Sequence, residues 1–165
     1  MPRKEGMHEK ETVRGSRSKQ SLRVWLRLLT AHNLIETQIR RRLQEQFRRT
    51  LPQFDVLAEL EHAGEPQTMS QLSRQLMVSN GNLTGVVDRL ERDGLVAREA
   101  SKADRRVQFI QLTDSGKAQF SEMAVDHERW LTELLLESPS EQLHDMESQL
   151  KDIIASLRNK LEHGD

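Results

Sequence analysis

Residues 79–116 read SNGNLTGVVDRLERDGLVAREASKADRRVQFIQLTDSG, and this stretch decides the fold. Its first half spaces apolar residues three and four positions apart, which predicts a helix ending near Gly94 whose buried side holds Leu83, Val86, Val87 and Leu90. Its second half changes period, and residues 95–99 and 107–112 read as two short strands around a polar turn. A helix followed directly by a hairpin is therefore predicted.

Two shorter helices are predicted upstream. The segments Thr50-Leu51-Pro52-Gln53 and Thr68-Met69-Ser70-Gln71 both have the pattern of a capping box, in which a cap hydroxyl and a Gln three residues later satisfy backbone donors. The first helix ends at Gly64. Two short helices joined by a turn and followed by a hairpin form the winged helix-turn-helix arrangement.

Long helices flank this module on both sides. Apolar residues recur at helical spacing over residues 22–47 and 114–136, and the last segment spaces its apolar residues in alternating steps of three and four, at Leu143, Met146, Leu150, Ile153, Leu157 and Leu161. That narrow seam is suited to pairing with another helix. Residues 1–19 are polar and basic and are expected to form a flexible arm. The fold class expected is mainly α with a small β-hairpin wing.

Composition narrows the class of protein. The 165 residues include no cysteine, which rules out disulfides and thiolate metal sites, and no apolar run approaches the roughly 20 residues needed to cross a bilayer. The N-terminus lacks the apolar core of a signal peptide, so a cytoplasmic protein with no membrane association is expected. Residues 1–50 carry 13 Lys or Arg against 5 Asp or Glu, whereas residues 114–165 carry 5 against 12. Such a basic segment is typical of polyanion binders and equally of solvated helix faces.

Neither an enzyme nor a metalloprotein is indicated. The sequence has no G-x-S-x-G motif, no Walker motif and no cysteine nucleophile. None of its six histidines forms an H-x-x-x-H pair or joins a compact acidic cluster, so no metal and no cofactor is expected.

The stretch from Leu51 to Gly116 resembles the MarR family of bacterial transcription regulators. The motifs that carry the resemblance are LTGVVDRLERDGLV, the wing-tip DRR and the closing LTDSG, at the family's spacing and between long helices. The resemblance implies a homodimer on double-stranded DNA, with residues 20–50 and 114–165 as the dimerisation domain and residues 51–113 as the DNA-binding domain. It also implies a pseudo-palindromic operator and, by the family's default, repression.

In this reading the helix after Ser79 is the recognition helix. Asn pairs well with adenine, and Ser or Thr bonds base edges or phosphates, so the predicted contacts are Ser79, Asn80, Asn82 and Thr84, with Arg89 farther along. Gly81 and Gly85 allow the backbone to approach the groove closely. The alternatives remain that Ser79-Asn80-Gly81 is only a cap and that Arg89 pairs with a nearby carboxylate.

Two further groups are assigned to DNA. Thr68 and Ser70 open the first helix of the motif, where hydroxyl and N–H groups are suited to phosphate, although capping explains Thr68 without DNA. By the resemblance, Arg106 enters the minor groove and Asp104 orients it, while Arg98, Lys102 and Arg105 contact phosphates. The alternative is a solvated hairpin tip with local ion pairs.

The resemblance also implies a small-molecule effector. The form LMVSNGNLTGVVDRL is similar to members that regulate aromatic-compound catabolism, so an aromatic acid or its coenzyme A thioester is the expected class. The candidate ligand-binding residues are Trp25, His32, Arg40, Phe54 and Trp130, although aromatic residues at helical spacing more often belong to the core. A different function stays open, namely a helical protein–protein interaction module that uses the winged-helix fold without specific DNA binding.

Overall fold

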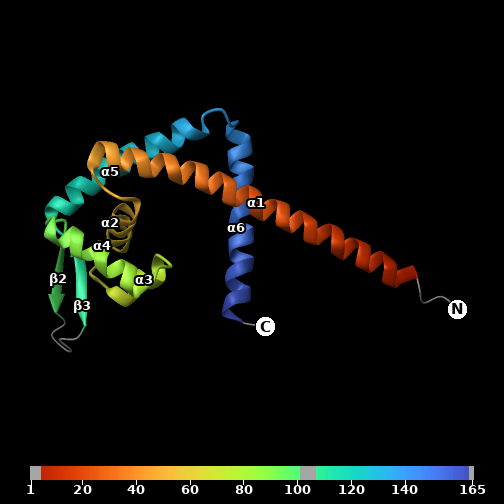
Figure 1. Cartoon of the computed structure of the whole chain (residues 1–165), viewed down its shortest axis with the longest axis horizontal. Helices are drawn as coiled ribbons and strands as arrows, with labels where there is room; N and C mark the ends of the chain where they lie inside the picture. Colours follow the sequence, from red (N-terminus) through yellow and green to blue (C-terminus); the bar gives the residue numbers. More distant parts are fainter. Residues whose placement is uncertain (1–4, 101–106, 164–165) are drawn as a thin grey trace. The chain divides into compact units, whose positions relative to one another are not determined.

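The computed structural model describes residues 5–100 and 107–163, with side chains from residue 18 onward. In chain order its elements are α1 (Glu5–Phe47), α2 (Leu51–Ala63), β1 (Gln67–Thr68), α3 (Met69–Gln75), α4 (Asn80–Arg92), β2 (Val96–Ala100), β3 (Gln108–Leu112), α5 (Asp114–Leu135) and α6 (Ser140–Glu162). Figure 1 shows α3 and α4 beside the β2–β3 hairpin. The predicted fold class, mainly helical with a small hairpin wing, is confirmed.

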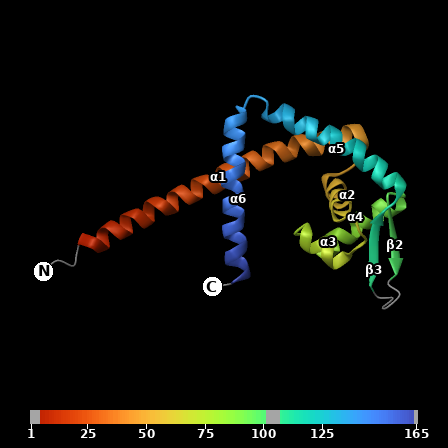
Figure 2. The ribbon, with the colours of Figure 1, turned by 180° about the vertical axis from the view of Figure 1, so that it is seen from behind.

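A three-stranded antiparallel sheet forms the base of the wing. Its order is β1-β3-β2, and β2 pairs with β3 from Val96 opposite Leu112 to Ala100 opposite Gln108. The two long strands lie side by side in both views (Figure 2). The sequence did not predict β1, a two-residue strand whose Gln67 lies opposite Ile110.

Side-chain caps begin the helices of this module, as the sequence predicts. The backbone N–H of Thr50 donates to Gln53 Oε1 at 2.9 Å, and that of Thr68 donates to Gln71 Oε1 at 2.8 Å. In return, Gln71 N–H donates to Thr68 Oγ1 at 3.3 Å, which completes the capping box of α3. Gly64 ends α2 with a φ of 65°, the left-handed conformation expected of a C-terminal glycine.

The core of the module joins α2, α3, α4 and β3. One side chain from each is fully buried, at Leu57, Leu72, Val87 and Ile110. Burying each such side chain contributes about 1.5–3 kcal/mol, so this small core holds α4 in place.

A polar junction ties the base of the wing to α5. Thr113 N–H donates to Leu95 O at 3.1 Å, and its hydroxyl donates to Gly94 O at 2.6 Å. The same hydroxyl oxygen accepts from Gly116 N–H at 3.0 Å, which caps α5. Gly116 is buried against the Leu95 backbone. The LTDSG motif is therefore a joint between the wing and the helix that follows it.

Two expectations about helix ends are corrected. Residues 5–19, assigned to an arm, continue α1, because that segment contains no proline and intersperses Lys and Arg with Glu. The sequence pattern Ser138-Pro139-Ser140-Glu141 also suggests a Ser138 cap for the last helix. Instead α6 begins at Ser140 and Pro139 occupies the cap position, where no side chain caps the helix.

The chain divides into two compact units, Met1–His127 and Glu128–Asp165. In the first, α1 buries Ile39 and Leu43 but exposes the apolar residues of its earlier turns. In the second, Trp130 is buried and α6 buries no residue. The predicted division into dimerisation and DNA-binding domains stays a prediction. No described helix is long and apolar enough to cross a membrane.

Candidate nucleic-acid interface and adjoining cleft

The exposed face of α4 carries the residues that the sequence assigns to base recognition. Leu83, Val87 and Leu90 are buried, so the opposite side of the helix faces solvent. On that side and at the preceding cap lie Ser79, Asn80, Gly81, Asn82, Thr84, Gly85 and Arg89. One helix thus presents amides, hydroxyls and a guanidinium on a single surface, which is what reading a major groove requires.

Two glycines on this face are not required by the packing of the protein. A Cβ built on Gly81 or on Gly85 would meet no atom within 4 Å. A glycine inside a helix costs about 0.5–1 kcal/mol relative to alanine, so its presence at Gly85 calls for a reason outside the fold. A bare backbone surface that lets another molecule come close is such a reason.

Some hydroxyls on this surface also have local structural roles. Ser79 Oγ accepts from Asn82 N–H at 3.4 Å, and Thr84 Oγ1 donates to Asn80 O at 2.8 Å. Thr68 is part of the capping box of α3, and Ser70 is exposed in the first turn of that helix. Capping therefore accounts for Ser79 and Thr68, and their contacts with DNA stay a prediction.

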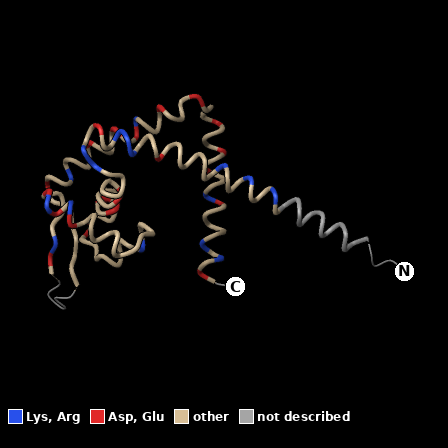
Figure 3. The backbone as a smooth tube through the Cα atoms, in the orientation of Figure 1, with Lys and Arg blue, Asp and Glu red and all other residues tan. Residues whose placement is uncertain are grey.

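Arg98 lies in an ion-pair network within the protein. From β2 its guanidinium reaches Asp88 Oδ1 at 2.5 Å and Glu91 Oε2 at 3.0 Å, both on α4. Its side chain is only 22% exposed. Acidic and basic residues gather where α4 adjoins β2 (Figure 3). The sequence assigned Arg98 to phosphate, whereas this geometry favours a positioning role in which Arg98 fixes the wing against the recognition helix.

Replacing Arg98 with alanine separates these two roles. We expect DNA affinity to fall while the slope of log K against log salt stays unchanged, because no phosphate contact is lost. An Arg89→Ala variant is the comparison, since Arg89 is exposed on the α4 face. Loss of a phosphate contact reduces that slope by about 0.9 for each arginine removed. A slope reduced by Arg98→Ala as much as by Arg89→Ala would restore the phosphate role. Fluorescence anisotropy at several salt concentrations measures both.

The predicted wing-tip contacts are Lys102, Asp104, Arg105 and Arg106. All four lie outside the described residues. Their roles stay predictions, and the experiment proposed below addresses Arg106 directly.

The five candidate ligand-binding residues differ in their surroundings. Trp25 and His32 are exposed on α1, and Trp130 is 1% exposed. Phe54 is buried in a ring cluster, with its centroid 4.7 Å from that of His127. Burial lowers the pKa of His127, which suits a neutral ring stacked on an aromatic one. Arg40 borders a cleft.

That cleft has a volume of about 420 Å³ and lies within the first unit. Helices α1, α2 and α4 and the α3–α4 connection all contribute to its wall, which includes Arg40, Asp55, Val56, Val78, Asn82 and Val86. The wall is mostly apolar with a few polar groups, as in small-molecule sites. Asn82 borders the cleft and also belongs to the exposed face of α4.

Asp55 is the unusual group in this wall, and the sequence analysis missed it. Burial raises the pKa of its carboxyl from 3.8 to about 6; Arg40 opposes that change and Glu36 adds to it. Among the described residues, Asp55 has no hydrogen bond and no ion pair. No local motif marks it, because its burial arises from packing against neighbouring elements.

An Asp55→Asn variant is expected to be more stable than the wild type at neutral pH. The raised pKa means that the protonated form stabilises the fold below pH 3.8, and this contribution is lost as the pH rises through about 6. The partly exposed carboxylate then costs about 1 kcal/mol at pH 7.5, after allowance for solvent screening. Urea unfolding at pH 4 and pH 7.5 measures the difference, which should vanish at pH 4. A Glu59→Gln variant on the same helix is the control, and an equal gain at both pH values would contradict the assignment.

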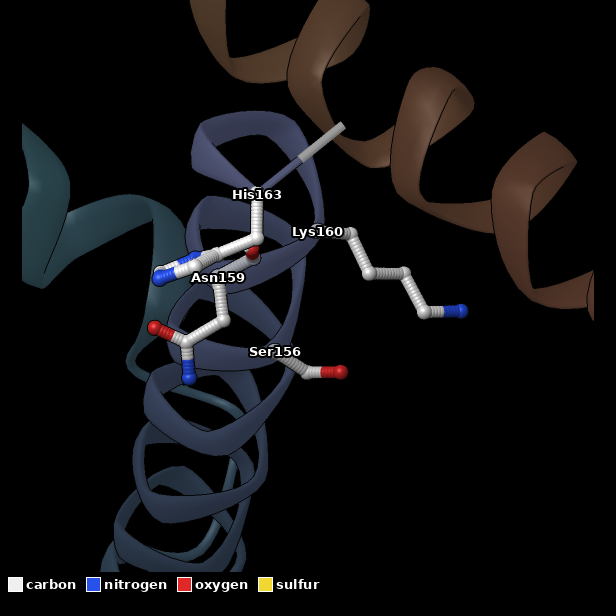
Figure 4. Close-up of a pocket in the computed structure, with 4 residues that line it drawn as sticks. All are labelled: Ser156, Asn159, Lys160 and His163. Atoms are coloured by element: carbon white, nitrogen blue, oxygen red, sulfur yellow. Dashed lines mark hydrogen bonds between the residues drawn. The ribbon is translucent and has the colours of Figure 1, made fainter. Parts of the chain in front are cut away.

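Another hollow in the structure is less suited to binding a small molecule. Ser156, Asn159 and Lys160 of α6 and the cap residue His163 line an open hollow of about 1030 Å³. Figure 4 shows these four side chains at the end of the helix. All four come from one short stretch of chain and enclose no buried group. In the described part of the chain, no three His, Asp or Glu residues are grouped so that they could hold a metal ion.

Comparisons with known proteins identify the family. Residues 50–107 match the family model described as the MarR family. The organic hydroperoxide resistance transcriptional regulator of Bacillus subtilis is 35% identical over 112 residues, which cover 67% of this chain and 74% of that protein. The regulator MhqR of the same organism is 36% identical over 83 residues, which cover 50% and 57%. The matches span about half the length of the first curated relatives.

A solved structure extends the likeness beyond the matched segment. The MarR family transcriptional regulator from Silicibacter pomeroyi superposes with a TM-score of 0.75 at 30% identity, over 86% of this chain and 97% of that one. BldR from Sulfolobus solfataricus, at 21% identity and a TM-score of 0.74, shares the fold. The exposed recognition face, the wing and the flanking helices therefore occur together in a chain that belongs to the MarR family.

Proposed function

We propose that this protein is a DNA-binding transcription regulator that acts as a homodimer on a pseudo-palindromic operator. Repression as the mode of action follows the family's default. Control by a small-molecule effector, and a regulatory target among genes of aromatic-compound catabolism, come from the sequence resemblance. The observation that carries the DNA-binding proposal is the exposed face of α4.

That face suits a DNA groove for a physical reason. The apolar side of α4 packs into the core. Its outer side presents Asn80, Asn82 and Thr84 around two glycines, and a Cβ built on either glycine would contact no other atom. Asn side chains make bidentate contacts with adenine, and each such contact is worth about 1–3 kcal/mol of discrimination.

A second copy of the chain is the partner that the flanking helices favour. In α1, Leu22, Trp25 and Leu26 are 50–59% exposed, and in α6 Leu157 and Leu161 are 53% and 82% exposed. Apolar surfaces of this kind mark association sites. A dimer would bury them and would place two recognition helices on one DNA, as a two-fold operator requires. Sedimentation analysis at micromolar concentration is expected to give a dimer.

The function is tested by binding of the purified protein to duplex DNA that flanks its own gene. We expect a specific complex whose affinity falls about a thousandfold between 50 and 200 mM salt, because a dimer of this size neutralises several phosphates. Arg106→Ala should weaken the specific complex about tenfold or more, since both subunits lose the predicted minor-groove contact. Arg158→Ala on α6 removes the same charge outside residues 51–113 and should have little effect.

The outcome discriminates between two functions. Specific, salt-sensitive binding that requires Arg106 supports the regulator. Equally weak binding by wild type and variant at every DNA sequence would favour the protein–protein interaction module.

A further inference from the structure

Arg49, at the junction of α1 and α2, contacts three helices. Its side chain is 15% exposed. Its Nη1 pairs with Oδ2 of Asp93, the residue at the C-cap of α4, and its Nε donates to Gln119 Oε1 of α5 at 2.9 Å. Its backbone N–H donates to the carbonyl oxygen of Leu43, a fully buried residue of α1, at 3.3 Å. Arg49 therefore ties the end of α4 to both α1 and α5.

The backbone at this junction holds Arg49 in a fixed place. Arg48 has a φ of 57°, a left-handed conformation that residues other than glycine rarely adopt. It turns the chain away from α1, and its own N–H donates to Gln44 O at 3.2 Å. Because Thr50 then begins the capping box of α2, Arg49 lies between two helix ends with little freedom to move. Such a place suits a side chain that holds another element in position.

The partner on α4 lies where a carboxylate is unfavourable. The C-terminal end of a helix carries partial negative charge, so an anion there destabilises the helix unless a cation is near. Asp93 is 42% exposed, and its carboxylate pairs with Arg49. Arg98 of β2 pairs with Asp88 and Glu91, which lie just before Asp93 on the same helix. Two guanidinium groups thus hold this end of α4, one from the wing and one from the junction of α1 and α2.

We propose that Arg49 is a positioning residue for DNA recognition, which fixes the C-terminal end of α4 against α1 and α5 and so sets the angle at which the outer face of α4 meets the groove. This role rests on the proposed function. A helix rises about 1.5 Å per residue, so Asp93 lies about 17 Å from Asn82, and a tilt of about 5° displaces Asn82 by about 1.5 Å. A hydrogen bond to a base edge, about 2.7–3.2 Å long, does not survive such a displacement.

This role predicts a selective loss of affinity. Base contacts carry the sequence information, whereas binding to an unrelated sequence depends on charges near phosphates and not on the angle of one helix. The Arg49 guanidinium is already paired with Asp93 and Gln119 and is mostly enclosed. Its removal should therefore weaken binding to specific DNA and leave binding to unrelated DNA, with its salt dependence, unchanged. A side chain that served stability alone would change neither affinity in a folded protein.

Fluorescence anisotropy compares two duplexes of equal length, one that flanks the protein's own gene and one with the same bases in scrambled order. We expect Arg49→Ala to bind the first about tenfold more weakly and the second within about twofold of the wild type. Arg49→Lys keeps a charge that can pair with Asp93 and should stay within about threefold on both duplexes. Arg48→Ala removes the same charge from an exposed neighbour, so this matched control should keep the wild-type ratio of the two affinities. Urea unfolding confirms that each variant is folded in the assay.

A double-mutant cycle tests whether Arg49 acts through Asp93. Asp93→Ala should lower the ratio of specific to unrelated affinity about as much as Arg49→Ala does, and the double variant should lower it less than about twofold further. The proposal is overturned if Arg49→Ala keeps the ratio while the wild type binds its own flanking DNA specifically. It is also overturned if Arg49→Ala reduces the slope of log K against log salt as Arg89→Ala does, because Arg49 would then contact phosphate itself.

Hydrogen exchange on the free protein separates this role from the proposed function. The N–H groups of Asp93 and Gly94 donate to Arg89 O at 3.0 Å and to Glu91 O at 2.9 Å. We expect both to exchange about fivefold faster in Arg49→Ala, because the end of α4 opens more often, while the amides of α3 keep their wild-type rates. Unchanged exchange would overturn the anchoring of α4 without any reference to DNA. A wild type that binds both duplexes equally would overturn the proposed function, and with it the recognition role of Arg49, while exchange still decides whether Arg49 anchors α4.

Discussion

Replacing Gly116 with alanine is expected to lower the free energy of unfolding by about 3 kcal/mol. A Cβ at this position would overlap the carbonyl oxygen of Leu95 and lie 2.9 Å from its carbonyl carbon. The atoms that the Cβ would meet belong to the Leu95 backbone, in the joint between the wing and α5. Backbone atoms cannot rotate away as a side chain would. The helix propensity gained, about 1 kcal/mol, offsets only part of the clash.

Thermal and urea unfolding at a fixed protein concentration measure this loss, since the stability of the proposed dimer would depend on concentration. A loss of this size corresponds to a fall in Tm of about 10 °C for a chain of this length. Ser115→Ala, one residue away and exposed, is the matched control and should change stability by less than about 0.5 kcal/mol. A Gly116→Ala protein with wild-type stability would mean that α5 does not approach Leu95 as closely as the structure has it.

The helices of the module could be predicted because their signals are local. Apolar periodicity and cap residues lie within a few positions of one another, as at Thr68 and Gln71, so the sequence contains the whole interaction. The strand β1 could not be predicted in this way. Its two residues have no alternation, and they form a strand only because Gln67 pairs with Ile110, 43 positions later in the chain.

The ends of the long helices show a second limit. A pattern such as Ser138-Pro139-Ser140-Glu141 satisfies the rule for a cap, yet Ser138 N–H instead bonds Leu135 O and closes the turn after α5. At the N-terminus, low apolar content suggested an arm, although helix propensity and charge alternation are sufficient for a helix. Hydropathy indicates which face is buried, and it is a weaker guide to where a helix begins.

For the candidate site, the sequence predicted which residues face outward from α4. It did not predict the contacts that side chains of the site make with other helices and strands. Arg98 is ten positions from Asp88, and only the hairpin brings its guanidinium back to α4. Asp55 is an ordinary helical residue until the α3–α4 connection and α1 enclose it. Roles that depend on tertiary neighbours of this kind have no signature at short spacing.

Gly85→Ala is expected to raise stability and lower DNA affinity at the same time. Alanine in the interior of α4 stabilises a helix by about 0.5–1 kcal/mol relative to glycine, and here its Cβ meets no atom of the protein. In the proposed complex with DNA, the same methyl group would occupy space that the groove needs, once in each subunit of the proposed dimer. We expect the affinity for specific DNA to fall about tenfold or more, because in the proposed function close apposition of helix and groove positions Asn82 and Thr84.

Opposite signs in the two measurements are what make this variant informative. A substitution that merely damaged the fold would lower stability and DNA affinity together. A glycine that the packing of the protein requires would not gain stability when it is replaced by alanine. Urea unfolding and anisotropy titration on one preparation give both values, and Ser121→Ala on the exposed side of α5 is the control that should leave DNA affinity unchanged. If Gly85→Ala gains stability and keeps full affinity, the outer face of α4 does not approach DNA closely and the recognition surface must be sought elsewhere. If affinity falls while stability rises, the glycine is retained for its partner, at a cost to the protein that carries it.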